Sequence, residues 1–213
     1  MAGPLVIDPA GWRCVPGHFA ERHGLIVIIA LGESIVAIGV GAEAGVTTGV
    51  VVAACVGIGI AAALWWLYFD IVALVAERRL SNAAAGRERN TIARDSFSYL
   101  HFPMVAGIVL VALGLKKTLE HVADPLKVVP AAALLGGAAI YLAAHVAFRW
   151  RNVHRFSLER TVVAVLLVTL LPAAVELPAL LTVTIVGLLL AAVIAIETRR
   201  LAELRDRLRH AHH

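Results

Sequence analysis

Apolar residues dominate this chain in six long runs, each close to the length of a membrane-spanning helix. The runs cover residues 22–41, 46–76, 97–115, 126–148, 153–171 and 179–196. Because an α-helix rises about 1.5 Å per residue, about 20 mostly apolar residues cross about 30 Å of hydrocarbon. The fifth run is the least regular, since Glu159 and Arg160 interrupt its first turns before Pro172 closes it. The pattern predicts an all-α fold, a polytopic bundle of about six transmembrane helices.

The composition favours the same class of protein. Of the 213 residues, 60% are hydrophobic and 16% are charged, whereas soluble domains average about 45–50% apolar and about 25% charged residues. The two cysteines, Cys14 and Cys55, suggest neither a disulfide framework nor a CxxC site. Prolines and charges break up the first 17 residues, which therefore do not resemble a signal peptide.

Positive charge is distributed unevenly between the segments that join the apolar runs. Sixteen of the 19 Lys and Arg residues, all of them arginine, fall on one side of six alternating spans. Only Lys116, Lys117 and Lys127 fall on the other side. Because cytoplasmic loops carry the excess of Lys and Arg, both termini are expected in the cytoplasm. The net charge of +4 then reflects loops beside a lipid bilayer, and no nucleic-acid partner is expected.

The expected domain organisation follows from these runs. Residues 1–17 form a cytoplasmic amino-terminal segment, residues 18–196 the six-helix transmembrane domain, and residues 197–213 a cytoplasmic amphipathic tail. The tail is most simply a solvated charged end of the last helix. Polar residues are thus expected mainly at the two membrane surfaces, and a polar residue within a run requires an explanation.

Glu33 is such a residue, in the stretch HFAERHGLIVIIALGESIVAIG that begins at His18. It follows Arg22 by 11 residues, which places it roughly 16 Å into the membrane, near the midplane. An ionised carboxylate at this depth costs several kcal/mol unless it is protonated, paired or hydrated. We therefore expect Glu33 to face the bundle interior, as a functional group or as a buried acid that connects helices.

Other titratable side chains gather towards the cytoplasmic ends of four runs. They are His18, Glu21, Arg22, Asp70, His101 and His145. Together they predict a polar vestibule that opens to the cytoplasm and leads to Glu33. Simpler alternatives are interfacial anchoring for Glu21 and Arg22, and capping or ion pairing for Asp70. The simpler interpretation of His145 is an interfacial histidine.

The sequence contains no familiar catalytic or metal-binding motif. The histidines of HFAERH are five residues apart, so the stretch matches neither HExxH nor HxxEH. No catalytic residue, cofactor or metal is therefore expected. The leading hypothesis is transport of a small solute or ion, channel-like or coupled to protons or cations, with Glu33 as the midplane site. The alternatives are an enzyme acting on a lipid or isoprenoid, and a structural or regulatory membrane subunit.

Three segments resemble signature regions of the bacterial low temperature requirement A family. They are HFAERHGLIVIIALGESIVAIG from His18, WWLYFD ending at Asp70, and SYLHFPMVAGIVLVALGL from Ser98. A looser similarity extends over most of the chain. The resemblance implies a multi-pass protein of the bacterial inner membrane, from a family named for a requirement during growth in the cold.

The chain departs from the family pattern in its length. Family members are typically nearly twice as long, and their amino-terminal half carries a phenylalanine-rich acidic motif of the ELFFDLVF kind. No such motif precedes Gly11. The chain thus resembles the carboxy-terminal half of the family. Three alternatives follow: a truncated chain, a chain that assembles with a separate amino-terminal half, or one that functions as a homo-oligomer.

Overall fold

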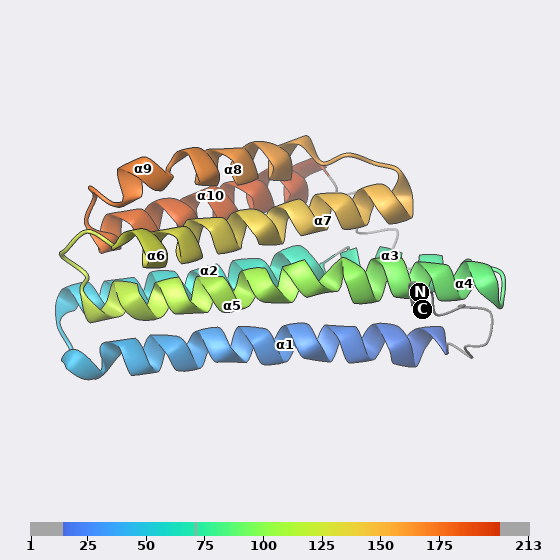
Figure 1. Ribbon diagram of the computed structural model, residues 1–213, viewed down its shortest axis with the longest axis horizontal. Coiled ribbons are helices and arrows are strands. Elements are labelled where there is room, and N and C mark those ends of the chain that lie inside the picture. Colours follow the sequence, from blue (N-terminus) through green and yellow to red (C-terminus); the bar gives the residue numbers. More distant parts are fainter. Residues whose placement is uncertain (1–14, 71, 201–213) are drawn as a thin grey trace, which may run out of the picture.

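The computed structural model describes residues 15–70 and 72–200, which form helices and connecting loops with no strand among them. The helices are α1 (Pro16–Gly41), α2 (Thr48–Phe69), α3 (Val72–Asn82), α4 (Arg87–Ile92), α5 (His101–Glu120), α6 (Val128–Ala131), α7 (Gly137–Val153), α8 (Leu158–Thr169), α9 (Leu171–Ala174) and α10 (Ala179–Arg200). A 3-10 turn, η2 (Ala42–Ala44), and two π-helical turns, η3 (Ala93–Tyr99) and η4 (Ala132–Gly136), connect some of them. The long helices lie side by side in an elongated bundle (Figure 1). Most of the expected segments 1–17 and 197–213 lie outside the described residues.

Five helical segments of the described chain are long and apolar enough to cross a membrane. They cover Pro16–Gly41, Thr48–Asn82, Arg87–Glu120, Val128–Val153 and Ala179–Arg200. These segments cover all or nearly all of the first four expected runs and the sixth, which confirms a bundle of membrane-length helices. The number of spans and the side on which the termini lie stay predictions.

The expected fifth span, residues 153–171, is divided between two short helices. α8 ends at Thr169, and α9 begins at Leu171 with Pro172 in its first turn. Proline lacks a backbone N–H, so it cannot continue the hydrogen-bond ladder of α8. The two helices run back along the bundle beside α7 and α10 (Figure 1). Neither reaches the length of a span by itself, because the turn at Leu170 interrupts them.

The first backbone N–H groups of α2 and α10, which have no partner within their own helix, find acceptors nearby. Thr47 caps α2, since its side chain accepts a hydrogen bond from the N–H of Val50 at 3.3 Å. α10 begins against the loop after α5, where the N–H of Ala179 donates to the carbonyl of Asp124. Local sequence and neighbouring loops thus define where these helices begin.

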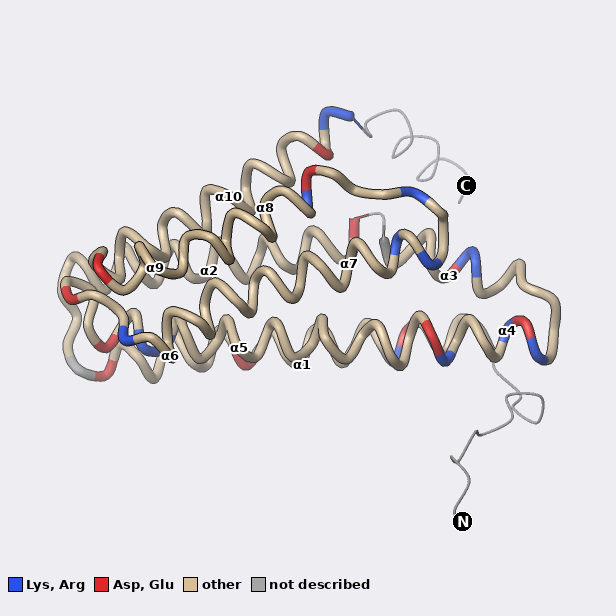
Figure 2. Tube along the Cα trace, turned by 45° about the horizontal axis from the view of Figure 1, so that its top comes forward, with Lys and Arg blue, Asp and Glu red and all other residues tan. Residues whose placement is uncertain are grey.

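The charged residues lie mainly at the two ends of the bundle (Figure 2). The described arginines gather where α1 begins and α10 ends, and the lysines gather near the start of α6. We call these the arginine end and the lysine end. Between them the surface is apolar: Ile29 is 72% exposed and Leu188 is 65% exposed. A broad apolar surface between two charged ends fits contact with lipid tails.

Glycines allow α5 and α7 to cross closely at the centre of the bundle. A Cβ atom added at Gly107 would lie 2.6 Å from the carbonyl oxygen of Gly137, and one added at Gly137 would lie 2.7 Å from that of Gly107. Small residues commonly permit such close contacts between transmembrane helices. α5 also packs extensively on α1, so it connects both sides of the bundle.

The Gly137→Ala substitution is expected to lower the free energy of unfolding by about 1–3 kcal/mol, because the added methyl group overpacks a backbone contact. Gly136→Ala is the matched control, since a Cβ at Gly136 meets no heavy atom within 4 Å. Denaturation in mixed detergent micelles, followed by circular dichroism, measures both variants. Equal stability of the two would contradict the close crossing.

Candidate functional site

The expected site residues are divided between the surface and the interior of the bundle. His18, Glu21 and Arg22 lie exposed on α1 at the arginine end, with His18 Nδ1 and Glu21 Oε2 3.7 Å apart. His101 and His145 are buried, at 3% and 0% exposure. Asp70 follows the last residue of α2 and is partly buried. The two histidines therefore come together inside, whereas the group on α1 stays outside.

The sequence predicted that Glu33 faces the bundle interior, but the structure places it on the outside of the bundle. It is exposed on α1 and makes no hydrogen bond or ion pair within the described chain. The side of α1 that packs inward carries Val27, Ala30, Leu31, Ser34, Ala37 and Ile38. Because successive residues of a helix point about 100° apart, burial of Ser34 turns Glu33 outward.

Tyr68 and His101 form a hydrogen bond that joins α2 to α5 inside the bundle. The Tyr68 hydroxyl and His101 Nε2 are 2.7 Å apart, and His101 Nδ1 lies 3.1 Å from the carbonyl oxygen of Ser96. A carbonyl can only accept, so Nδ1 carries the proton and Nε2 accepts from Tyr68. Ser96 also donates from its hydroxyl to Asn152 Oδ1 at 2.9 Å, which extends the network to α7.

His145 lies next to this bond and has an unused ring nitrogen. Its Nδ1 donates to the carbonyl of Tyr141 at 2.9 Å, and the Tyr141 hydroxyl donates to the carbonyl of Leu64 on α2. The imidazole ring lies 4.3 Å from the ring of Tyr141 and 6.1 Å from that of Tyr68, between centroids. His145 Nε2 is buried without a hydrogen-bond partner among the described residues. It is therefore a free acceptor in the interior.

Aromatic rings from η3, α7 and α1 surround His101. Phe97 stacks on the imidazole at 5.3 Å with an interplanar angle of 8°, and Phe148 contacts it edge-on at 5.3 Å. His23 of α1 approaches with its ring centroid at 5.2 Å. These rings keep the Tyr68–His101 bond in an apolar environment, where a hydrogen bond is electrostatically stronger than in water.

A buried ion pair joins α8 to α10 close to the same part of α2. Arg160 Nε and Nη2 donate to the two carboxylate oxygens of Glu197, each at 2.8 Å, and the side chains are 3% and 12% exposed. Arg149 adds a weaker contact to Glu197 at 3.4 Å. Arg160 Nη2 also donates to the carbonyl of Leu67 at 3.3 Å, whereas Nη1 is buried without a partner in the described chain.

Several members of the buried site have no counterpart among the residues expected from the sequence. They are Tyr68, Ser96, Tyr141, Asn152, Arg160 and Glu197. The signal for two of them was present, because Arg160 interrupts an apolar run and Glu197 directly follows one. The sequence could not show that Arg160 and Glu197 pair, because 37 residues separate them.

A cavity of about 430 Å³ lies between α1 and the α2–α3 segment at the arginine end. Glu21 and Glu77 contribute carboxylates to its lining, and Tyr68 forms part of its wall. Along α1 it extends as far as Ile28, which leaves Glu33 outside it. The expected vestibule is therefore corrected: the cavity leads to Tyr68 and not to Glu33.

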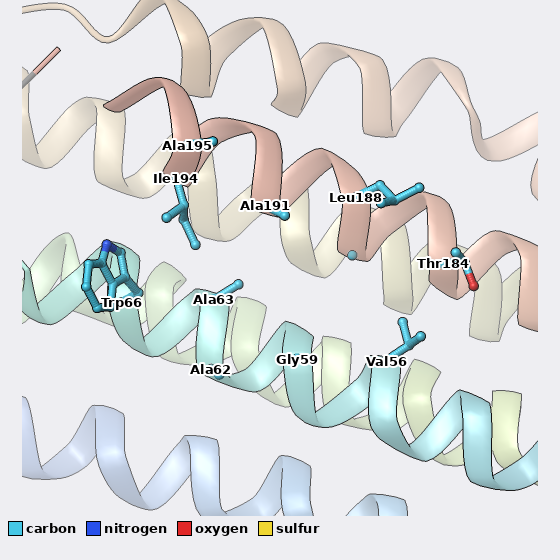
Figure 3. Close-up of a pocket in the computed structure, with 11 residues that line it drawn as sticks. Val56, Gly59, Ala62, Ala63, Trp66, Thr184, Leu188, Ala191, Ile194 and Ala195 are labelled. Atoms are coloured by element: carbon cyan, nitrogen blue, oxygen red, sulfur yellow. The ribbon is translucent and has the colours of Figure 1, made fainter. Parts of the chain in front are cut away.

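A second cavity, of about 540 Å³, is a groove between α2 and α10 (Figure 3). Small apolar residues such as Gly59, Ala63 and Ala191 line it, with Trp66 towards one end. The lining offers no titratable side chain. Within the described ranges, moreover, no three His, Cys, Asp or Glu side chains lie close enough to hold a metal ion.

Loss of Arg160 alone is expected to lower the free energy of unfolding by about 3 kcal/mol, because Glu197 would remain buried without its main partner. The double variant Arg160→Leu/Glu197→Leu is expected to regain much of that loss, since both buried charges are then absent. Arg200→Leu is the control. Arg200 is 69% exposed and pairs with Glu159 in the first turn of α8. Exposed ion pairs contribute only about 0–1 kcal/mol to stability. Detergent unfolding of these three variants and of Glu197→Leu measures the effect, and a double variant as unstable as the sum of its two singles would refute it.

Comparison with known proteins gives one family and one relative. The family model described as "Bacterial low temperature requirement A protein" matches residues 1–195. A protein of Rhizobium meliloti, named as uncharacterized, is 34% identical over 128 residues, which amount to 59% of this chain and 30% of that protein. This chain thus matches less than a third of the relative's length. No solved structure matches the chain significantly.

The family match covers most of the chain, and the long apolar helices point to a multi-pass membrane protein. The chain belongs to the bacterial low temperature requirement A protein family.

Proposed function

We propose that this chain transports protons, or a small solute or ion coupled to them, across the bacterial inner membrane, with its arginine end in the cytoplasm. One observation carries the proposal. A cavity at the arginine end reaches Tyr68, and the Tyr68 hydroxyl donates to the buried His101. A tyrosine in the wall of the cavity therefore contacts an imidazole inside the bundle.

The energetic cost of the buried polar groups supports a functional role. Ionisable residues within transmembrane segments are rare and often mark proton or ion paths. Stability does not require them, because well-packed apolar residues can replace buried ion pairs at little cost. The Tyr68–His101 bond, the free His145 Nε2 and the Arg160–Glu197 pair nevertheless lie within one part of the bundle.

The chemistry of the first step is a proton exchange along existing hydrogen bonds. Glu21 and Glu77 in the cavity lining attract cations and raise their local concentration. The Tyr68 hydroxyl passes its proton to His101 Nε2 and takes one from a hydronium ion in the cavity, so the tyrosine stays neutral and the positive charge moves from the cavity to the imidazole of His101. His145 Nε2, beside the Tyr68 ring, is the next free acceptor in the interior.

In this proposal Glu33 is the mid-membrane carboxylate that binds the transported cation or proton. His23 contacts His101 and lies on the same helix as Glu33, ten residues away, or about 15 Å along the axis. The route between the buried cluster and Glu33 therefore follows the surface of α1 and does not pass through the bundle core.

An enzyme acting on a lipid or isoprenoid is less well supported by the geometry. Its acid–base or metal-binding groups would be His18, Glu21, Asp70 and His101. His18 and Glu21 lie on the exposed surface, Asp70 is partly buried and His101 lies in the interior. The groove between α2 and α10 could accommodate an apolar chain, but its lining offers no titratable side chain to act as an acid or a base.

Tyr68→Phe is expected to lower proton flux roughly tenfold or more, because it removes the hydroxyl that links the cavity to His101. The matched control is Tyr99→Phe, since Tyr99 is 66% exposed. Liposomes that contain the purified protein and a pH-sensitive dye report the flux under an imposed gradient. Wild-type flux in the Tyr68 variant would rule out this entry path.

Glu33→Gln is expected to abolish flux while membrane insertion stays normal, because an amide cannot bind and release the transported charge at mid-depth. Glu43→Gln, which changes an exposed carboxylate of η2 at the lysine end of the bundle, should leave flux unchanged. The same liposome assay is used, with protein content measured in each preparation. If both variants transport normally, Glu33 has no role in transport.

A further inference from the structure

Small residues of α1 leave open the cavity of about 430 Å³ at the arginine end. Gly17, Ala20 and Gly24 line it at intervals of three and four residues, which places them on one side of the helix. Ala73 of α3 adds a small side chain to the opposite wall. Because binding sites for small molecules are typically clefts of about 300–1,000 Å³, the cavity is large enough to hold one.

Every charged side chain that lines this cavity is a carboxylate. Glu21 and Glu77 belong to the lining, and no Lys, Arg or His does, although the described arginines gather at this end of the bundle (Figure 2). Glu77 reaches from α3 towards α1, since its Oε1 lies 4.0 Å from the position of a Cβ added at Gly17. Both carboxylates are exposed, so they form the outer, negatively charged part of the cavity.

The inner part of the cavity is apolar and aromatic. Leu25 and Ile28 continue the wall along α1, and Ile28 lies seven residues beyond Glu21, or about 10 Å along the helix axis. Tyr68 and Phe69 contribute two rings from α2, and the faces of aromatic rings attract cations as well as apolar groups. A molecule that matches both parts therefore has a positive group at its outer end and an apolar body.

The side chains of the lining do not suit a metal ion. Ca²⁺ and Mg²⁺ take about six or more oxygen ligands, whereas the lining supplies two carboxylates and the hydroxyl of Tyr68, which already donates to His101. No three His, Cys, Asp or Glu side chains in the described ranges lie close enough to hold a metal. An organic cation requires no such coordination sphere, because charge attraction and apolar contact suffice to hold it.

We propose that this cavity binds an organic cation, an ammonium group that carries an apolar body. The positive group lies between Glu21 and Glu77, and the body extends along α1 past Leu25 towards Ile28, beside the ring of Phe69. Binding does not depend on transport. The assignment of this cation as the solute coupled to protons rests on the proposed function.

Equilibrium dialysis against the protein in phosphatidylcholine nanodiscs tests the site, with binding to empty nanodiscs subtracted. The probe is hexyltrimethylammonium, whose cationic head and hexyl chain match the two parts of the cavity. Hexyl sulfate has the same chain with the opposite charge, and tetramethylammonium has the head without the chain. Each is expected to bind roughly tenfold more weakly than the probe, because it lacks one of the two attractions. An affinity for either compound as high as that for the probe would overturn the proposal.

The double variant Glu21→Gln/Glu77→Gln is expected to bind the probe roughly tenfold more weakly, because the charge attraction is lost. Glutamine keeps the size of both exposed side chains, so the fold is retained. Glu88→Gln, which changes an exposed carboxylate of α4 outside the cavity, should bind like the unmodified protein. Unchanged affinity in the double variant would show that the carboxylates hold no cation. Tyr68→Phe keeps its ring in the wall and is expected to bind the probe while flux falls, so failure of this site and failure of the transport path can be told apart.

Discussion

The contact between α5 and α7 at Gly107 and Gly137 determines where the buried polar groups meet. It brings the two helices close enough for Phe148 of α7 to touch His101 of α5. α2 then lies beside both, and its Tyr68 reaches His101 while its Leu64 carbonyl accepts from Tyr141. With bulkier residues at the crossing, the same polar side chains would be separated by apolar contacts and would lack partners.

The sequence predicted the class of fold because a lipid environment demands long apolar runs, and such runs are easily recognised. It could not predict which side of each run faces inward. α1 is apolar on nearly all sides, so hydrophobic periodicity carries no information on its orientation. Residue size does not decide the orientation either, because the packed side of α1 contains Leu31 and Ile38 beside Ala30 and Ser34, and the exposed side contains Gly32 beside Ile29. The orientation of Glu33 depends on how α1 packs against α5 and α2.

The candidate site was only partly predictable for a related reason. His101 and His145 were found because histidines are conspicuous within apolar runs. Arg160 was taken as an interruption of a helix, since a charge in an apolar run gives no indication of its partner. Its pairing with Glu197 depends on how α8 packs between α7 and α10. Tyrosine and serine give still weaker signals, because both also occur at surfaces and at lipid interfaces.

The hydrogen bonds of the histidines with their own helices have an electrostatic consequence. His23 Nδ1 lies 2.8 Å from the carbonyl of Phe19, in the same arrangement as His145 and Tyr141, and His101 makes the equivalent bond one residue further back, within the π-helical turn η3. Because the bond at one ring nitrogen sets the tautomer of the other, the backbone assigns the proton to Nδ1 in all three rings. The buried His101 and His145 therefore each turn the lone pair of Nε2 into the bundle, where one accepts from Tyr68 and the other is unused, so the interior holds two basic nitrogens.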